Sequence, residues 1–347
     1  MNYDPAATGP RVILAYKNFA ANIAVSHIGL GVTAMSSAKV LRGTGTPTDV
    51  WAIISSQDLG AKLKAAQAQA PVSHVVVSAP WIPTAELEQL TASHPETKFA
   101  VNCHSNLGFL QADPGAMRLV REGLELQRST WNFQVAANSD RLATWVGATY
   151  GTPCAHLPNL YHLDQMAGQD RPLFSGGTLR IGAFGATRPL KNFMTAAGAA
   201  LEIAGRLRVD LEYWMSSGRN EGGGPLNSAI QQMTMGLRHV RVVENGWQTW
   251  PQFRQTVRHM HLLLQPSYTE TFNVVTADGI AEGVPSVVSN AIAWAPDDWK
   301  AKVDDVHHIA TVGLRLLSDK RAPRRGLKAL QSYNQRSIRT WERFLAA

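Results

Sequence analysis

The stretch 261–289, HLLLQPSYTETFNVVTADGIAEGVPSVVS, decides the fold of this chain. Residues 261–265 form a short apolar run that a proline ends, and residues 284–289 form a second apolar run. Between them, residues 270–282 carry apolar side chains at roughly helical spacing, and Gly283 ends that pattern. The stretch therefore predicts a strand, a loop, a helix over 270–282 and a second strand.

A strand that feeds a helix through a short loop places the helix N-terminus at the carboxyl edge of a parallel sheet, where α/β folds bind ligands. The free N–H groups and the positive end of the helix dipole at this place suit a phosphate. Two acids stand out, because Glu270 opens the predicted helix and Asp278 lies eight residues later. Eight residues are about 2.2 helical turns, so both carboxylates could face one cleft.

The segment 270–289 resembles the donor-binding motif of retaining GT-B glycosyltransferases, the family 4-type superfamily of glycogen synthases and mannosyltransferases. That motif is an acid, then x-F-G, then a second acid eight residues after the first, then A-x-A-x-G-x-P. Glu270 and Asp278 match the two acids, and Phe272 matches the aromatic position. The end of the motif is matched by Ala281, Gly283 and Pro285.

Three positions depart from this motif. Asn273 replaces a glycine, although Asn tolerates unusual backbone angles better than most residues. Asp278 replaces a glutamate and is one methylene shorter, and Gly279 replaces an alanine, which weakens the helix. The alternative interpretation is a plain β-α-β unit in which Glu270 only favours the helix dipole.

Composition bounds the class of protein. The 347 residues, 45% of them hydrophobic, suit two domains of ordinary size. The sequence has no charged-then-apolar leader and no apolar run near the about eighteen residues of a membrane span, so we expect a soluble, cytoplasmic protein. Cys103 and Cys154 lack zinc or CxxC spacing and are expected to be free thiols. The absence of a DxD triplet argues against a metal-dependent GT-A transferase.

Apolar runs of strand length alternate with helical patterns along the whole chain, which predicts doubly wound α/β domains with mainly parallel sheets. Residues 158–177, rich in Pro, Gly and polar residues, are interpreted as the linker. The resemblance implies the GT-B fold, two Rossmann-like domains that face a cleft. Residues 1–165 would be the acceptor-side domain, onto which a C-terminal helix, 328–347, crosses back. Residues 172–327 would bind the nucleotide-sugar.

The second domain opens with a strand that enters a glycine turn, followed by ATRPLKN. Pro189 suits the first turn of a helix, which we expect to continue to about residue 206. Arg188 and Lys191 would then lie at a helix N-terminus, where a nearby anion would offset the unfavourable position of two cations. The family places an Arg and a Lys of a G-x-x-R-x-x-K-N segment against the donor diphosphate, and the resemblance assigns this role to Arg188 and Lys191. The alternative is two solvated basic residues.

Two further residues are candidates by position. His104 follows an apolar run, 98–103, and many family members have a His at this place that contacts the donor sugar. The alternative is a His that only hydrogen-bonds a loop. Trp247 lies in a loop where the family commonly contacts the nucleotide base, and it could equally pack in the core. The glycine-rich first loop of the family has no glycine here, in residues 17–22, so the role of that loop stays open.

The resemblance implies transfer of a hexosyl or pentosyl group from a nucleotide-sugar, UDP- or GDP-linked, with retention and without a metal or other cofactor. Preorganised cations and N–H groups would stabilise the leaving diphosphate. Glu270 would hold sugar hydroxyls, Asp278 the ribose hydroxyls, and His104 the sugar from the other domain. The predicted site comprises His104, Arg188, Lys191, Trp247, Glu270, Thr271, Phe272, Asn273, Val274 and Asp278.

The charge is concentrated at the C-terminus. The chain has a net charge of +7, and residues 319–347 hold eight basic residues against two acids. The basic residues within 320–343 could meet DNA, an anionic membrane surface or an acidic acceptor, or form a solvated tail. The acceptor would be a glycan, lipid or small molecule, or a hydroxylated base in DNA as in viral DNA-modifying enzymes. Alternative functions are a GT-B-like sugar-nucleotide epimerase and an inactive sugar-nucleotide-binding module.

Overall fold

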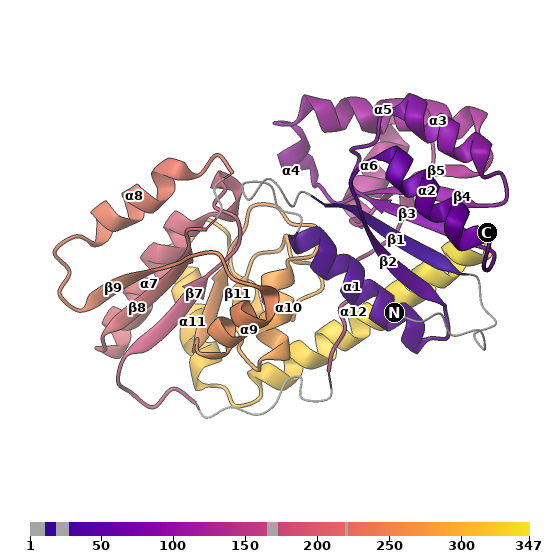
Figure 1. Cartoon of the computed structure of the whole chain (residues 1–347). Coiled ribbons are helices and arrows are strands. Elements are labelled where there is room, and N and C mark those ends of the chain that lie inside the picture. Colours follow the sequence, from indigo (N-terminus) through magenta and orange to yellow (C-terminus); the bar gives the residue numbers. More distant parts are fainter. Residues whose placement is uncertain (1–10, 19–27, 165–172, 219–220) are drawn as a thin grey trace. The chain divides into compact units, whose positions relative to one another are not determined.

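The structure, a computed structural model, describes residues 11–18, 28–164, 173–218 and 221–347 (Figure 1). The chain divides into two compact units, Met1–His162 with Asn334–Ala347, and Leu163–Tyr333. The early loop that departs from the family falls mostly in residues 19–22, which lie outside the described residues.

Unit 1 alternates strands and helices around one sheet. The strand order is β2-β1-β3-β4-β5-β6, and neighbouring strands pair in parallel. The elements are β1 (Val12–Lys17), α1 (Ile28–Gly43), β2 (Thr48–Ile53), α2 (Ser56–Gln67), β3 (His74–Ser78), α3 (Thr84–Ser93), β4 (Lys98–Cys103), α4 (Leu107–Leu110), α5 (Pro114–Ser129), β5 (Phe133–Ala137), α6 (Asp140–Tyr150) and β6 (Ala155–His156).

Unit 2 repeats this plan with a sheet of order β11-β10-β7-β8-β9, again parallel. Its elements are β7 (Leu179–Ala183), η1 (Pro189–Lys191), α7 (Phe193–Leu207), β8 (Leu211–Ser216), α8 (Gly224–Thr234), β9 (Val240–Asn245), α9 (Trp250–Arg258), β10 (Leu262–Gln265), α10 (Val274–Ala281), β11 (Ser286–Val288), η2 (Asp297–Trp299) and α11 (Val306–Ser318). The last helix, α12 (Ala322–Ala346), begins in unit 2 and ends in unit 1. The predicted doubly wound α/β fold is therefore confirmed.

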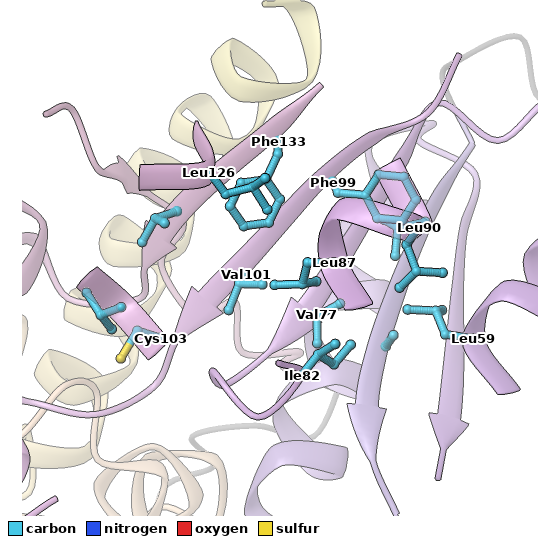
Figure 2. Close-up of a cluster of buried hydrophobic side chains, with 14 of the residues drawn as sticks. Leu59, Val77, Ile82, Leu87, Leu90, Phe99, Val101, Cys103, Leu126 and Phe133 are labelled. Carbon is cyan, nitrogen blue, oxygen red and sulfur yellow. The ribbon is translucent and has the colours of Figure 1, made fainter. Parts of the chain in front are cut away.

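The sheet of unit 1 is buried on both faces, as its uninterrupted apolar strands require. On β1, Ile13 and Ala15 belong to one core cluster, whereas Val12 and Leu14 belong to the other. Figure 2 shows part of the first cluster, where side chains from β3, β4 and β5 meet side chains of the covering helices. The second cluster includes Trp341, near the end of α12. The Trp341 Nε1 donates a hydrogen bond to Pro158 O at 2.8 Å. The expected return of the C-terminal helix to the first unit is thus present.

Both cysteines are free thiols, as expected, and burial raises the pKa of Cys103 to about 11 and that of Cys154 to about 12. Among the helices of the described residues, none is both long enough and apolar enough to cross a membrane.

Burial of His74 predicts a pH dependence of stability. His74 is 3% exposed, and this burial lowers its pKa to about 4. The unfolded chain takes up that proton near pH 6.5, so stability is retained above this pH and is lost as the pH falls from about 6.5 to about 4.

We expect the free energy of unfolding from urea titrations to fall between pH 7 and pH 5 by about 2 kcal/mol through His74 alone. His74→Gln should remove that part of the decrease. His239→Gln, at a side chain that is 85% exposed, is the control and should leave the decrease unchanged. An equal decrease in wild type and His74→Gln would contradict the assignment.

Candidate functional site

The site lies at the carboxyl edge of the sheet of unit 2. Strand β7 pairs with β10 on one side and β8 on the other, so the loops after these three strands emerge next to one another. The loop after β7 carries Arg188 and Lys191, the loop after β8 carries Glu221, and the loop after β10 carries Glu270. Charged side chains of three separate segments therefore gather at this edge.

The segment around Lys191 differs from the expected continuous helix. Residues 189–191 form a single 3-10 turn, and α7 begins only at Phe193. Asn192, between them, is left-handed with φ 59°, and its Nδ2 donates to Pro266 O at 3.1 Å and to Val303 O at 2.6 Å. These two hydrogen bonds to loops distant in sequence stabilise the break between the 3-10 turn and α7. Arg188 and Lys191 therefore precede α7 and do not lie in its first turn.

An ion pair joins two of the predicted residues. Lys191 Nζ lies 2.5 Å from Glu270 Oε1, and the two side chains are only 15% and 9% exposed. Gly185, with φ 124°, supplies the turn after β7 in a conformation that other residues rarely adopt. A buried charge is costly without a partner, so each of the two groups requires the other or a ligand.

The loop before α10 corrects the predicted helix. The helix spans Val274–Ala281, and Glu270 lies three residues before the N-cap Asn273. The expectation that Glu270 opens the helix is wrong, and helical spacing does not relate it to Asp278. The reason is Asn273, whose left-handed backbone, with φ 66°, ends the loop and starts the helix.

Asn273 serves the site with its side chain as well as its backbone. Its Oδ1 accepts from Thr276 N at 2.8 Å, which caps the helix. Its Nδ2 donates to Glu270 Oε1 at 2.9 Å and to Gln265 Oε1 at 3.1 Å. The residue that replaces the motif's glycine therefore adopts a left-handed conformation and also fixes the Glu270 carboxylate.

Of the other residues of the motif, Phe272 is packed in the interior, whereas Thr271 and Val274 lie at the edge of the site. The ring of Phe272 is 2% exposed and stacks on Trp294, with ring centres 5.2 Å apart. Trp294 Nε1 also donates to Phe272 O at 2.6 Å, so this aromatic pair anchors the loop. Thr271 and Val274 are half-buried, and Val274 begins α10, whose first-turn N–H groups have no acceptor within the helix.

Asp278 is enclosed. It is 1% exposed, and its Oδ1 accepts a hydrogen bond from Trp250 Nε1 at 3.1 Å. Arg254 lies over the ring of Trp250, 5.5 Å from its centre, and pairs with Glu282 at 2.5 Å. Asp278 thus belongs to a polar network between α9 and α10, and its contact with a ribose stays a prediction.

Arg188 has a partner that the sequence did not suggest. Its guanidinium pairs with Glu221, whose N–H donates to Thr187 O at 2.9 Å. A Cβ on Gly223 would lie 2.5 Å from Thr187 O, so only glycine lets this loop approach so closely. Burial lowers the pKa of Arg188, and the Glu270 carboxylate opposes that effect. The loop after β8 has no helical or strand periodicity. The only sequence signal for Glu221 was that it is the single acid of this loop.

Two aromatic side chains are exposed at the same edge of the sheet. Trp247, after β9, is 45% exposed, so its ring is available to a ligand and is not a core residue. Tyr268, after β10, is 51% exposed, and its N–H donates to Leu190 O at 2.9 Å. Tyr268 is not among the residues predicted from the sequence, although its place two residues before Glu270 was a usable signal.

His104 belongs to unit 1, whereas the other predicted site residues belong to unit 2. It follows β4, and its Nδ1 lies 3.4 Å from Asn138 Nδ2. An amide nitrogen is a donor, so Nδ1 accepts and the ring proton lies on Nε2. Burial lowers the pKa of His104 to about 4. At neutral pH this side chain is therefore an uncharged hydrogen-bond donor.

Within the ranges that the structure describes, no three His, Cys, Asp or Glu side chains are grouped so that they could hold a metal ion. The charges of the site come instead from two cations and two carboxylates, Arg188 with Glu221 and Lys191 with Glu270. Such an arrangement can bind an anion only if the anion competes with the carboxylates or adds to the N–H groups of α10.

Comparison with known proteins supports the fold. No protein-family model matches the sequence, and no curated protein matches it. Solved structures do resemble it. Sucrose-phosphate synthase from Thermosynechococcus elongatus has a TM-score of 0.63 at 13% identity, over 96% of this chain and 98% of that one. The UDP-forming α,α-trehalose-phosphate synthase from Burkholderia xenovorans has a TM-score of 0.59 at 11% identity, over 98% of both chains.

A third structure is a variant of S. aureus TarM in complex with fondaparinux, α-GlcNAc-glycerol and UDP. It has a TM-score of 0.58 at 12% identity, over 79% of this chain. The chain spans 55% of the length of that protein. These structures are GT-B glycosyltransferases, so the two parallel α/β units of this chain have the GT-B fold.

Proposed function

We propose that the chain is a glycosyltransferase that moves a hexosyl or pentosyl group from a nucleotide-sugar to an acceptor, with retention and without a metal ion. The observation that carries the proposal is the pair of half-buried cations, Arg188 and Lys191, beside the N-terminus of α10. Two of the similar structures are described with UDP, as a bound molecule or as a product, which favours a UDP-sugar over a GDP-sugar.

The reaction breaks the bond between the sugar and the diphosphate, so negative charge grows on the leaving group. Lys191 and Arg188 are placed to stabilise that charge, together with the N–H groups of residues 272–274. Preorganised cations are effective here because they lie in a partly buried site, where charge interactions are weakly screened.

Hydrogen bonds would orient the sugar and the nucleoside. Glu270, held by Lys191 and Asn273, is the acceptor for sugar hydroxyls. A role for His104, which is neutral and protonated on Nε2, as hydrogen-bond donor to the sugar stays a prediction. Asp278 is assigned to the ribose, and Trp247 or the newly found Tyr268 to the base. The acceptor, whether a glycan, a lipid, a small molecule or a hydroxylated DNA base, stays a prediction.

The first test is binding and hydrolysis of a panel of UDP- and GDP-sugars. We expect one donor to raise the melting temperature of the wild type and to release its nucleoside diphosphate slowly. Lys191→Ala should weaken donor binding about tenfold to a hundredfold, the effect of a lost charge-assisted hydrogen bond. Glu270→Ala should abolish the release of the diphosphate.

Lys300→Ala is the matched control in the same unit, because Lys300 pairs with Asp297, a side chain that is 97% exposed. It should bind the donor like the wild type. Absence of binding by every nucleotide-sugar would refute the transferase. Conversion of the donor into its epimer, with no acceptor product, would instead indicate the epimerase. Binding without hydrolysis or transfer would indicate the inactive binding module.

Glu221 should compete with the donor for Arg188. The Glu221 carboxylate is paired with the Arg188 guanidinium, so a diphosphate must displace this carboxylate or be repelled by it. Glu221→Gln is therefore expected to bind UDP and inorganic pyrophosphate about tenfold more tightly in calorimetric titrations, a difference of about 1.4 kcal/mol.

Glu212→Gln is the control for Glu221→Gln, since Glu212 pairs with the largely exposed Arg241 in the same unit. It should leave both affinities unchanged. Weaker binding by Glu221→Gln would mean that the carboxylate holds Arg188 in its binding position and does not compete with the ligand.

A further inference from the structure

The exposed face of α12 is strongly basic. The helix contains six basic residues and a single acid, Glu342. Successive exposed side chains recur every three or four residues and so lie on one face of the helix. That face consists of Arg324, Lys328, Gln331, Gln335, Arg336, Arg339, Glu342 and Arg343.

The opposite face of α12 is packed inside the protein. Leu330 and Trp341 are almost completely buried, and Ser337 is 4% exposed. A Cβ on Gly326 would lie 2.4 Å from the Trp299 ring, so the helix lies very close to its neighbour there. The apolar side of α12 is therefore already occupied, and the basic side is the one that a partner can reach.

Arg325 lies beside this face and does not belong to it. Arg325 lies 2.6 Å from both Asp298 and Asp319, so two acids of other segments balance it. On the exposed face, basic residues follow one another three or four positions apart, as in 324 and 328 or 336, 339 and 343. Like charges at this spacing destabilise a helix by a few tenths of a kcal/mol per pair, and a bound polyanion would relieve that repulsion.

We propose that this face of α12 binds double-stranded nucleic acid through its phosphates, without reading sequence. The basic row from Arg324 to Arg343 is about 28 Å long. Over that length a duplex presents about one negative charge per 1.7 Å. Four of the five exposed cations are arginines, whose planar fork binds phosphate in a bidentate way. Interleaved Gln331 and Gln335 add hydrogen-bond donors.

The packing of α12 favours nucleic acid over a membrane surface, and contact with the nucleic-acid backbone over insertion into a groove. A helix that binds a membrane surface places its apolar face among the lipids, and the apolar face of α12 is buried in the protein. For the same reason the helix cannot sink deeply into the major groove. It can contact only the backbone, which positions a protein without specifying sequence. This inference concerns α12 alone and does not depend on the proposed transferase activity.

The test is fluorescence anisotropy of the full chain with two labelled duplexes of unrelated sequence. Five phosphate contacts predict equal affinity for both and a slope of log K against log salt of about −4.5. The triple variant Lys328→Gln, Arg336→Gln, Arg339→Gln should reduce that slope in magnitude by about 2.7. At low salt it should also weaken binding at least a hundredfold.

The control triple, Arg118→Gln, Arg121→Gln, Arg241→Gln, removes the same three charges from positions already paired with Glu122, Glu125 and Glu212. It should bind duplex nearly like the wild type. An equal loss in both triples would overturn the proposal, because net charge alone would then explain binding. Preference for one duplex sequence would also overturn it.

Vesicles of equal parts phosphatidylserine and phosphatidylcholine form the second arm. If the chain binds these vesicles and does not bind duplex, the ligand of this face is a lipid surface and the proposal is refuted. Circular dichroism checks that the triples are folded. If the α12 triple does not fold, Lys328→Gln and Arg339→Gln are tested singly, and each should lower the slope by about 0.9.

Discussion

The ion pair between Lys191 and Glu270 is the interaction on which the candidate site depends. It joins the loops after β7 and β10, two segments that are 79 residues apart in sequence, and it does so with both side chains largely buried. Partly buried charges are stable only with partners, and here each cation of the site has a carboxylate. The edge of the sheet is therefore held together by the groups that the proposed reaction would use.

Two asparagines make this arrangement possible. Asn192 and Asn273 both adopt left-handed backbone conformations and both turn a loop into a helix. Their side-chain amides then tie the loops, Asn192 to Pro266 and Asn273 to Glu270. A glycine could adopt the same backbone angles but would supply none of these bonds. The departure of this chain from the glycosyltransferase motif at Asn273 is thus a substitution that gains contacts.

The helix α12 serves both units of the fold. Its first part packs in unit 2 and its last part carries Trp341 into the core of unit 1. Because the apolar residues are committed to these contacts, the basic residues are left on the solvent side. Much of the excess positive charge of the chain is consequently displayed along one helix.

The sequence by itself determined the α/β class, the alternation of strands and helices, and the motif that points to a nucleotide-sugar site. The strand Lys98–Cys103 could be predicted to the residue, because a short run of mainly apolar residues is a local signal. The tertiary structure alone decided where α10 begins, why the helix after Pro189 breaks, and which acids face Arg188 and Lys191. The start of α10 depends on the backbone conformation of Asn273, which a helical pattern does not reveal. The other two depend on bonds between residues far apart in sequence, and such contacts exist only after the sheet has brought its loops to one edge.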